Sequence, residues 1–272
     1  MKGNKLKIGR IPYANLFPIF YYLDRECNLS EYTFIKGVPS RLNRMLRAGD
    51  LDISPSSSIE FLRNRGKYRV LPWLSVSSTG PIKSILLFST LPIEELGEKT
   101  IALSSDSETS AALLKILLKE VYSLKCRFKP TDLRSVKNIL SSASAVLHIG
   151  DTAMMEARKF LSPVPNPSSL YIYDLGEIWN KHTGLPFTYA LWVVRIKSLH
   201  EKTDLIKKLS LDLIAARKYA SRKLSIIARE APQKKWISEK ELVDYWKIIS
   251  YDFTEKHLEG LRLFEKYALK NS

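Results

Sequence analysis

A run of serines after a short acidic strand is the stretch whose residue types most clearly suggest chemistry. The sequence Asp52-Ile-Ser-Pro55 leads directly into Ser56, Ser57 and Ser58, and an apolar helical pattern follows. The first N–H groups of a helix have no intrahelical partner, and the helix dipole favours negative charge there. Serine hydroxyls at this position either cap the helix or donate hydrogen bonds to a carboxylate. The second role predicts a binding site for an organic anion, and simple capping is the alternative.

Two further segments repeat the order of strand, hydroxyl or acidic residues, and helix. One follows the predicted strand 99–103, and its candidate ligand-binding residues are Ser107, Thr109 and Ser110. The other follows the predicted buried strand 145–149, where Asp151 either caps the next helix or faces a ligand. The first segment also fits a capping box, so capping is the alternative there too. The recurrence favours a binding site built from several strand ends.

Asn15 and Ser84 are the two polar residues that we expect closest to a reaction. Asn15 lies after a predicted strand that begins at Leu6 and before a helix that has Pro18 in its first turn. Ligands bind at such strand ends in open α/β sheets, although an N-cap role would also explain an asparagine. Ser84 ends a hydroxyl-rich segment that begins at Ser75, which we interpret as a crossing between domains or, alternatively, a surface loop.

The elements that position these residues alternate between strands and helices, which indicates an α/β fold. Two apolar strands far apart in the sequence, 85–88 and 189–194, are predicted to connect two lobes. Lobe I is then 1–88 plus 191–272, and lobe II is the inserted segment 89–190. We expect a ligand between the lobes, at strand ends and helix N-termini. The chain after Ser198 is predicted to form packing helices.

Composition and charge exclude several classes of protein. The 272 residues are 45% hydrophobic and carry a formal net charge of +15. The basic residues are spread along amphipathic helices rather than gathered with aromatic residues in a stripe, so we predict no nucleic-acid partner. A positive field still steers a small polyanion. No apolar run approaches the roughly 18 residues of a membrane span, and polar residues follow the basic N-terminus, so we expect a cytoplasmic protein. The sequence carries no signal for an oligomeric state.

Metal and cofactor motifs do not occur in the sequence. The two cysteines form neither a disulfide framework nor a zinc site, and the four histidines lack metal-ligand spacing. No nucleotide-binding glycine loop, nucleophile elbow or zinc-protease motif is present. His148 lies inside an apolar strand, which favours a packed core histidine over a ligand-binding one.

Several motifs in the correct order resemble the chorismate dehydratases of the futalosine route to menaquinone. The resemblance runs from about Lys7 to Arg195, and the C-terminal helices match only in general character. The motifs are Gly37-Val-Pro-Ser-Arg-Leu-Asn43, Asp52-Ile-Ser-Pro-Ser-Ser-Ser-Ile-Glu60, Ser77-Ser-Thr-Gly-Pro81 with Ser84, Asp174-Leu-Gly-Glu-Ile-Trp179 and Thr183-Gly-Leu-Pro-Phe187.

The resemblance implies a two-lobed, type-2 periplasmic-binding-protein-like fold in a cytoplasmic enzyme. It implies a hydro-lyase that converts chorismate to 3-[(1-carboxyvinyl)oxy]benzoate and water, without a metal or an organic cofactor. The polar active-site residues of the family fall on Asn15 and Ser84, both of which match. Related alternatives are the 1,4-dihydroxy-6-naphthoate synthase of the same pathway and a non-catalytic anion-binding protein.

The chemistry of this reaction requires a pocket for a dianion, removal of a ring proton and departure of a ring hydroxyl. Helix N-termini with serines suit the carboxylates, while Asn15 and Ser84 suit the hydroxyl or a carboxylate. No histidine or glutamate in the loops stands out as the base. The hypothesis is therefore that the enolpyruvyl carboxylate of the substrate takes the proton, with Asp151 and Glu177 as the alternatives on the protein.

Overall fold

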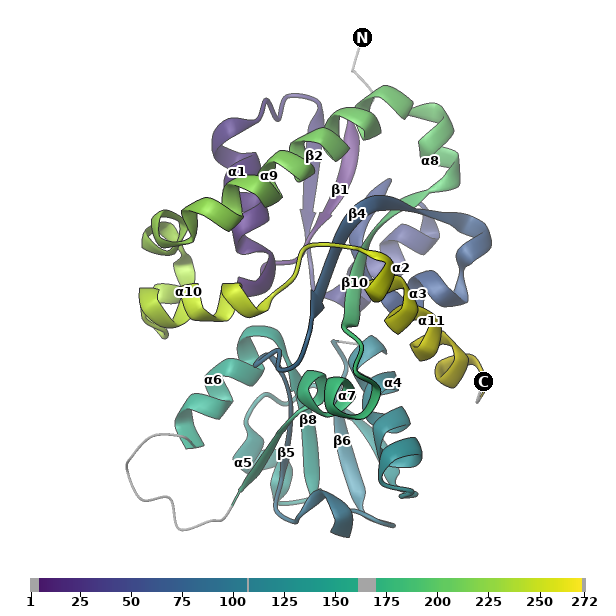
Figure 1. The fold of residues 1–272 in the computed structure, drawn as a ribbon, viewed down its shortest axis with the longest axis vertical. Helices are drawn as coiled ribbons and strands as arrows, with labels where there is room; N and C mark the ends of the chain where they lie inside the picture. The colour runs from purple at the N-terminus through teal and green to yellow at the C-terminus, as the bar shows by residue number, and fades with distance from the viewer. Residues whose placement is uncertain (1–4, 107, 161–169, 271–272) are drawn as a thin grey trace. The chain divides into compact units, whose positions relative to one another are not determined.

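The structure, a computed structural model, describes residues 5–106, 108–160 and 170–270 (Figure 1). Ser107, a predicted binding residue, lies outside the described residues. The chain divides into two compact units, each built on one five-stranded sheet. The first unit is Met1–Ser77 with Thr188–Leu258, and the second is Ser78–Phe187 with Glu259–Ser272.

The sheet of the first unit has the strand order β2-β1-β3-β10-β4. β1 is parallel to both β2 and β3, whereas β10 runs antiparallel to β3. Its strands are β1 (Leu6–Arg10), β2 (Tyr32–Lys36), β3 (Ile53–Ser57), β4 (Tyr68–Ser78) and β10 (Phe187–Arg195).

The helices of the first unit begin and end where local sequence signals place them. Pro18 lies in the first turn of α1, Gly49 ends α2 in the left-handed conformation at φ 94°, and Ser238 with Glu241 forms a capping box on α10. The helical segments are η1 (Ala14–Leu16), α1 (Phe17–Glu26), α2 (Pro39–Ala48), α3 (Ser58–Arg63), η2 (Arg65–Lys67), α8 (Ile196–Glu201), α9 (Thr203–Glu230), η5 (Pro232–Lys235) and α10 (Glu239–Ile248).

Helix α9 packs along α1, and the two lie side by side in Figure 1. From Ile206 to Ala220 its buried residues recur every three or four positions, as an amphipathic helix on a core requires. Lys223 departs from helical geometry and marks a kink near the end of α9. Ile206, Leu209 and Leu213 are buried on this helix, and Ile214 beside them is half-buried.

The sheet of the second unit has the strand order β7-β6-β8-β5-β9. β6 is parallel to β7 and β8, while β5 is antiparallel to β8 and β9. Its strands are β5 (Ile85–Ser89), β6 (Thr100–Ser104), β7 (Arg127–Thr131), β8 (Ala145–Ile149) and β9 (Tyr171–Asp174). The helical segments are η3 (Ile93–Glu95), α4 (Glu108–Ile116), η4 (Leu117–Val121), α5 (Val136–Leu140), α6 (Gly150–Phe160) and α7 (Leu175–Thr183), and α11 (Glu255–Leu269) enters this unit at Glu259.

The compact units differ from the predicted lobes at β5 and α11. β5 was predicted to belong to lobe I, but its hydrogen-bonded neighbours β8 and β9 place it inside the second sheet. Most of α11 also groups with the second unit, where Phe264 packs against Phe187 with ring centroids 5.0 Å apart. An apolar strand carries no sign of which sheet it joins, because that depends on pairing with distant residues.

The hydroxyl-rich segment before Ser84 is strand rather than loop at its start. β4 continues through Ser78, and the hydroxyls of its serines bond inside the protein. The Ser75 and Ser77 hydroxyl oxygens lie 2.5 Å apart, and Ser77 also donates to the Thr188 hydroxyl over 3.3 Å. These serines are therefore structural. Among the described residues, no helix combines the length and the apolar character that crossing a membrane requires.

Candidate functional site

One edge of the first sheet carries Asn15 and the serine run. β1 and β3 are parallel and adjacent, with Ile8 opposite Ile53, so their carboxyl ends lie at the same edge. Asn15 follows β1 in the turn η1, and Ser58 follows β3 as the first residue of α3. The structure therefore brings these predicted site residues of the first unit to a common edge.

The turn that carries Asn15 is held by side chains from the C-terminal part of the unit. The Trp246 indole N–H donates to the Ala14 carbonyl at 2.8 Å, and the Tyr251 hydroxyl donates to the Asn15 carbonyl at 2.6 Å. The Asn15 side-chain oxygen is buried and has no hydrogen-bond partner among the described residues. Buried polar atoms are almost always bonded, so this amide oxygen is a candidate for contact with a ligand.

The serine run divides into structural and available hydroxyls. Ser57 accepts a hydrogen bond from the Asn43 amide at 2.8 Å, and the Ser58 hydroxyl donates to the Thr188 carbonyl. Ser57 makes no side-chain cap bond to α3, so simple capping does not explain the run. The buried Ser56 hydroxyl has no partner among the described residues, which makes Ser56 the strongest candidate of the three for binding.

Asp52 anchors the strand that carries the serines. Its carboxylate accepts 2.7 Å hydrogen bonds from the Lys7 N–H, the Ser198 hydroxyl and the Lys202 ammonium. Burial alone would raise the pKa of Asp52, but these three donors and the Lys202 charge lower it overall. The ionised carboxylate thus joins β1, β3 and the start of α8 and α9. The sequence carries no signal for this role of Asp52, because its donors Lys7, Ser198 and Lys202 are remote along the chain.

A second group of predicted residues meets at one edge of the second sheet. β6 and β8 are parallel, and β5 is antiparallel to β8 with Ile85 opposite Ile149. The end of β8 and the beginning of β5 therefore share an edge, and the Gly150 N–H donates to the Ser84 carbonyl at 2.7 Å. Ser84 is buried, Asp151 follows Gly150 in α6, and Thr109 and Ser110 lie buried in α4 after β6.

Asp174 fixes the backbone directly before Ser84. Its carboxylate accepts hydrogen bonds from the N–H groups of Ile82 at 3.0 and 3.1 Å and Lys83 at 2.6 Å. The same carboxylate caps α7 by accepting from Gly176 at 2.9 Å and Glu177 at 3.2 Å. Burial raises the pKa of Asp174, and the backbone donors oppose that rise. The spacing Asp174-x-x-Glu177 before an apolar run is a capping signal in the sequence. It indicates the capping of α7 but not the hydrogen bonds from Ile82 and Lys83.

His148 is buried in β8, as predicted, and its ring also borders a polar cavity. The cavity has a volume of about 190 Å³ and is lined by residues at the carboxyl ends of three strands: Ser104, Ser105, Asp106, Thr131, Asp132, Leu133, Arg134, His148 and Thr152. His148 is 2% exposed, and its Nε2 has no partner among the described residues. Burial lowers the pKa of His148, so the imidazole is neutral at pH 7.

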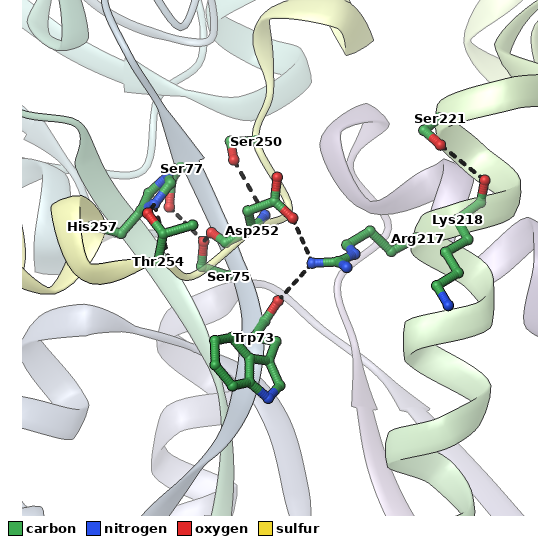
Figure 2. Close-up of polar contacts among 10 residues, drawn as sticks. All are labelled: Trp73, Ser75, Ser77, Arg217, Lys218, Ser221, Ser250, Asp252, Thr254 and His257. Atoms are coloured by element: carbon green, nitrogen blue, oxygen red, sulfur yellow. Dashed lines mark hydrogen bonds and ion pairs between the residues drawn. The ribbon is translucent and has the colours of Figure 1, made fainter.

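The first unit contains a larger cavity of about 560 Å³ beside α9 and the segment after α10. Figure 2 shows Arg217 reaching Asp252 and the carbonyl of the exposed Trp73, with distances of 2.5 and 3.2 Å. Lys247, another lining residue, lies 3.3 Å from the Asp244 carboxylate. Because these two cations are paired with carboxylates, much of the positive charge of the cavity is neutralised.

Metal binding finds no support in the part of the chain that the structure describes. Within it, no three histidine, cysteine, aspartate or glutamate side chains gather closely enough to hold a metal ion. Cys27 and Cys126 are free thiols there, and burial raises the pKa of Cys27 to about 11. The Cys27 thiol is therefore a poor nucleophile at neutral pH.

Comparison with known proteins identifies the relatives of this chain. A family described as menaquinone biosynthesis matches residues 6–270. A chorismate dehydratase of Thermus thermophilus is 33% identical over an alignment of 196 residues that covers 69% of this chain and 69% of that protein. A chorismate dehydratase of Campylobacter jejuni is 30% identical over 201 residues, covering 71% of this chain and 70% of that protein.

Solved structures share the fold at much lower identity. A protein of Archaeoglobus fulgidus superposes with a TM-score of 0.66 at 16% identity, covering 100% of this chain and 99% of that one. The periplasmic aliphatic sulphonate binding protein of Escherichia coli gives 0.66 at 11% identity, covering 98% and 92%. The predicted α/β fold of periplasmic-binding-protein type is confirmed. By its sequence over nearly its whole length, the chain belongs to the menaquinone biosynthesis family.

Proposed function

We propose that this protein is a chorismate dehydratase, a hydro-lyase that forms 3-[(1-carboxyvinyl)oxy]benzoate and water. The observation that carries the proposal is the 33% identity to a chorismate dehydratase over 69% of the chain. The net charge of +15 suits a dianionic substrate. We further propose that the enzyme works in the cytoplasm and that its substrate is free chorismate.

The reaction breaks one C–H and one C–O bond of the ring. The proton and the hydroxide leave as water, and the ring becomes aromatic, which supplies the driving force. The protein must therefore bind two carboxylates and orient the hydroxyl, and it need not supply an oxidant or a reductant. Asn15 suits orientation of the hydroxyl because its buried side-chain oxygen has no partner among the described residues. Ser84 and Ser56 provide buried hydroxyls for the hydroxyl or a carboxylate.

The proton acceptor in this proposal is the enolpyruvyl carboxylate of the substrate. It lies within the same molecule as the reacting C–H bond, so a bound conformer that brings them together makes the transfer intramolecular. Glu177 is exposed, so water competes for its carboxylate. Asp151 is half-buried and already interacts within the protein. We expect both to bind or stabilise rather than to remove the proton.

The test incubates the purified protein with chorismate and follows the ultraviolet absorbance of the aromatic product. Wild-type protein should convert chorismate, and Asp151→Asn and Glu177→Gln should retain turnover within about tenfold, below the 10²–10⁴-fold that a general base contributes. Asn15→Ala should lose about 10³-fold in kcat, as when an oriented hydrogen-bond partner of the transition state is removed. No conversion by folded protein would refute the dehydratase proposal, and calorimetric binding without conversion would support an anion-binding protein instead.

A further inference from the structure

We propose that Trp246 and Tyr251 are positioning residues that set the geometry of Asn15 by holding two consecutive backbone carbonyls. The inference rests on the proposed function, in which Asn15 contacts the substrate. The two donors lie 232 and 236 positions along the chain from their acceptors, in a segment whose sequence predicted only packing. Neither side chain contacts the reacting groups in this proposal, because both act on the backbone of the turn.

The turn lacks one hydrogen bond of a regular helix, and an external donor adds to the bond that the turn makes itself. In a regular helix the Ala14 carbonyl would accept from the N–H of residue 18, but residue 18 is proline. The Phe17 N–H instead makes the tighter bond of the η1 turn to Ala14. The Trp246 indole adds a second, buried hydrogen bond of 2.8 Å to this carbonyl. A carbonyl that has no exposed surface cannot be satisfied by bulk water.

The segment that carries the donors is itself fixed to the sheet. The Ser77 N–H donates to the Ser250 carbonyl at 2.9 Å, and the Ser250 N–H returns a bond to Ser77 at 2.8 Å. The Ser75 N–H donates to the Tyr251 carbonyl at 3.1 Å, one pleat further along β4. Figure 2 shows Ser250 and Ser77 on these neighbouring segments. Tyr251 therefore connects β4 to the Asn15 turn.

Packing and chemistry suit the two side chains to a positioning role. Trp246 stacks on Phe17, next to the turn, with ring centroids 6.2 Å apart and ring planes 17° apart. Both rings that carry the donors are almost fully buried, at 2% and 9% exposure. Burial raises the pKa of Tyr251 well above its usual value of 10.0, so its hydroxyl remains a donor throughout the useful pH range. The indole N–H of Trp246 does not titrate either.

A displaced Asn15 should slow the chemical step more than it weakens binding. Misplacement of an orienting group by about 1 Å can cost about 10²-fold in rate. We expect Tyr251→Phe, which deletes only the hydroxyl, to lower kcat about tenfold while KM changes less than twofold. Trp246→Phe should lower kcat to a similar extent. Tyr32→Phe is the matched control, since it deletes a buried hydroxyl that bonds Asp212 at 2.9 Å in the same unit. It should leave kcat within twofold.

A double-mutant cycle tests whether Tyr251 acts through Asn15. In the Asn15→Ala background, Tyr251→Phe should lower kcat less than twofold further, because the side chain that it positions is already absent. A tenfold loss that persists in that background would overturn the proposal. Equal kcat values for Tyr251→Phe and Tyr32→Phe in a protein that converts chorismate would also overturn it.

Hydrogen exchange gives a readout that does not depend on the reaction. Backbone amides in residues 11–20 should exchange at least about fivefold faster in Tyr251→Phe and Trp246→Phe than in wild type, because local opening follows the loss of local bonds. Their exchange rates should be unchanged in Tyr32→Phe. If wild-type protein fails to convert chorismate, the proposed function fails, while this comparison still decides whether the two donors fix the turn. Exchange that is the same in all variants refutes the positioning role.

Discussion

Two aspartates, the buried Asp52 in the first unit and the half-buried Asp174 in the second, anchor backbone beside the candidate site residues by different means. Asp52 accepts one backbone N–H and two side-chain donors, one of which is the Lys202 ammonium at 2.7 Å. The hydrogen bonds to Asp174 come from backbone N–H groups of Ile82, Lys83, Gly176 and Glu177. One anchor is an ion pair that joins strands and helices, and the other is a carboxylate that orders the 82–83 segment and caps α7.

The difference teaches what decides the sign of a pKa shift in a buried carboxylate. Burial is the largest influence on both groups, and it raises the pKa of each. For Asp52, the bonds to Lys202, Lys7 and Ser198 together outweigh it, so the pKa is lowered. For Asp174, the backbone N–H dipoles do not outweigh the effect of burial, so the pKa is raised. The carboxylate with the lowered pKa has a full positive charge in contact, and the carboxylate with the raised pKa has only N–H dipoles.

Removing the Asp174 carboxylate should have the largest effect, because several backbone N–H groups lose their acceptor at once. We expect Asp174→Ala to lower the free energy of unfolding by about 3 kcal/mol, combining the loss of a helix cap with unsatisfied buried donors. Chemical denaturation monitored by circular dichroism measures this. Asp174→Asn keeps one acceptor oxygen and should lose about half as much. An alanine variant as stable as wild type would show that the 82–83 segment does not depend on this anchor.

Removing the cation beside Asp52 should have the next largest effect. Lys202→Met is expected to lower the free energy of unfolding by about 2 kcal/mol, below the 3–5 kcal/mol of a wholly isolated buried charge because Ser198 and the Lys7 N–H remain. Lys197→Met is the control, since Lys197 and Glu201 are exposed at 69% and 53% and this pair should contribute less than about 0.5 kcal/mol. Equal losses for the two variants in urea denaturation would contradict the assignment of Lys202 as an anchor.

Acid should distinguish the two anchors by the sign of their contributions. The folded pKa of Asp52 lies below the unfolded value of about 3.9, so its stabilisation is present above that value and is lost as pH falls through the folded pKa. The folded pKa of Asp174 lies above its unfolded value, so its contribution is present at low pH and is lost as pH rises through the folded pKa. Each unit of pKa difference corresponds to about 1.4 kcal/mol.

Unfolding free energies measured from about pH 6 down to about pH 2 test these signs. Asp52→Asn should make stability fall less steeply with acid than in wild type, and Asp174→Asn should make it fall more steeply. Parallel pH profiles for the two variants would mean that the Lys202 contact does not decide the direction.

The smallest effect should come from one neutral donor to Asp52. Ser198→Ala removes a buried 2.7 Å hydrogen bond to the carboxylate and should cost about 1 kcal/mol. Ser221→Ala, which removes an exposed hydroxyl bond to the Lys218 carbonyl, should cost less than about 0.5 kcal/mol. Thermal denaturation of both variants measures the difference. If Ser198→Ala costs as much as Lys202→Met, the ion pair contributes no more than a neutral hydrogen bond.

Local signals in the sequence determined the α/β class, many element boundaries and the edges that carry Asn15, Ser84 and Asp151. Pro18, Gly49 and Ser238 act through the backbone of neighbouring residues, so their effects are readable without a fold. Strand periodicity likewise marks where a strand ends, and strand ends are where ligands bind in this class. The roles of individual site residues remain predictions to be tested with the variants above.

Only the tertiary structure decided which hydroxyls already form hydrogen bonds within the protein and what holds the candidate residues in place. The serine run looked uniform in sequence, but Asn43 and Thr188 bind two of its hydroxyls and leave Ser56. The anchors of Asn15 lie in the C-terminal helical region, more than 230 positions away. Such contacts arise when distant segments pack, and hydrogen-bond donors carry no sequence signal that names a remote acceptor. The spacing of residues in the sequence therefore determined which residues are candidates for the site, and the packing of distant segments determined their geometry.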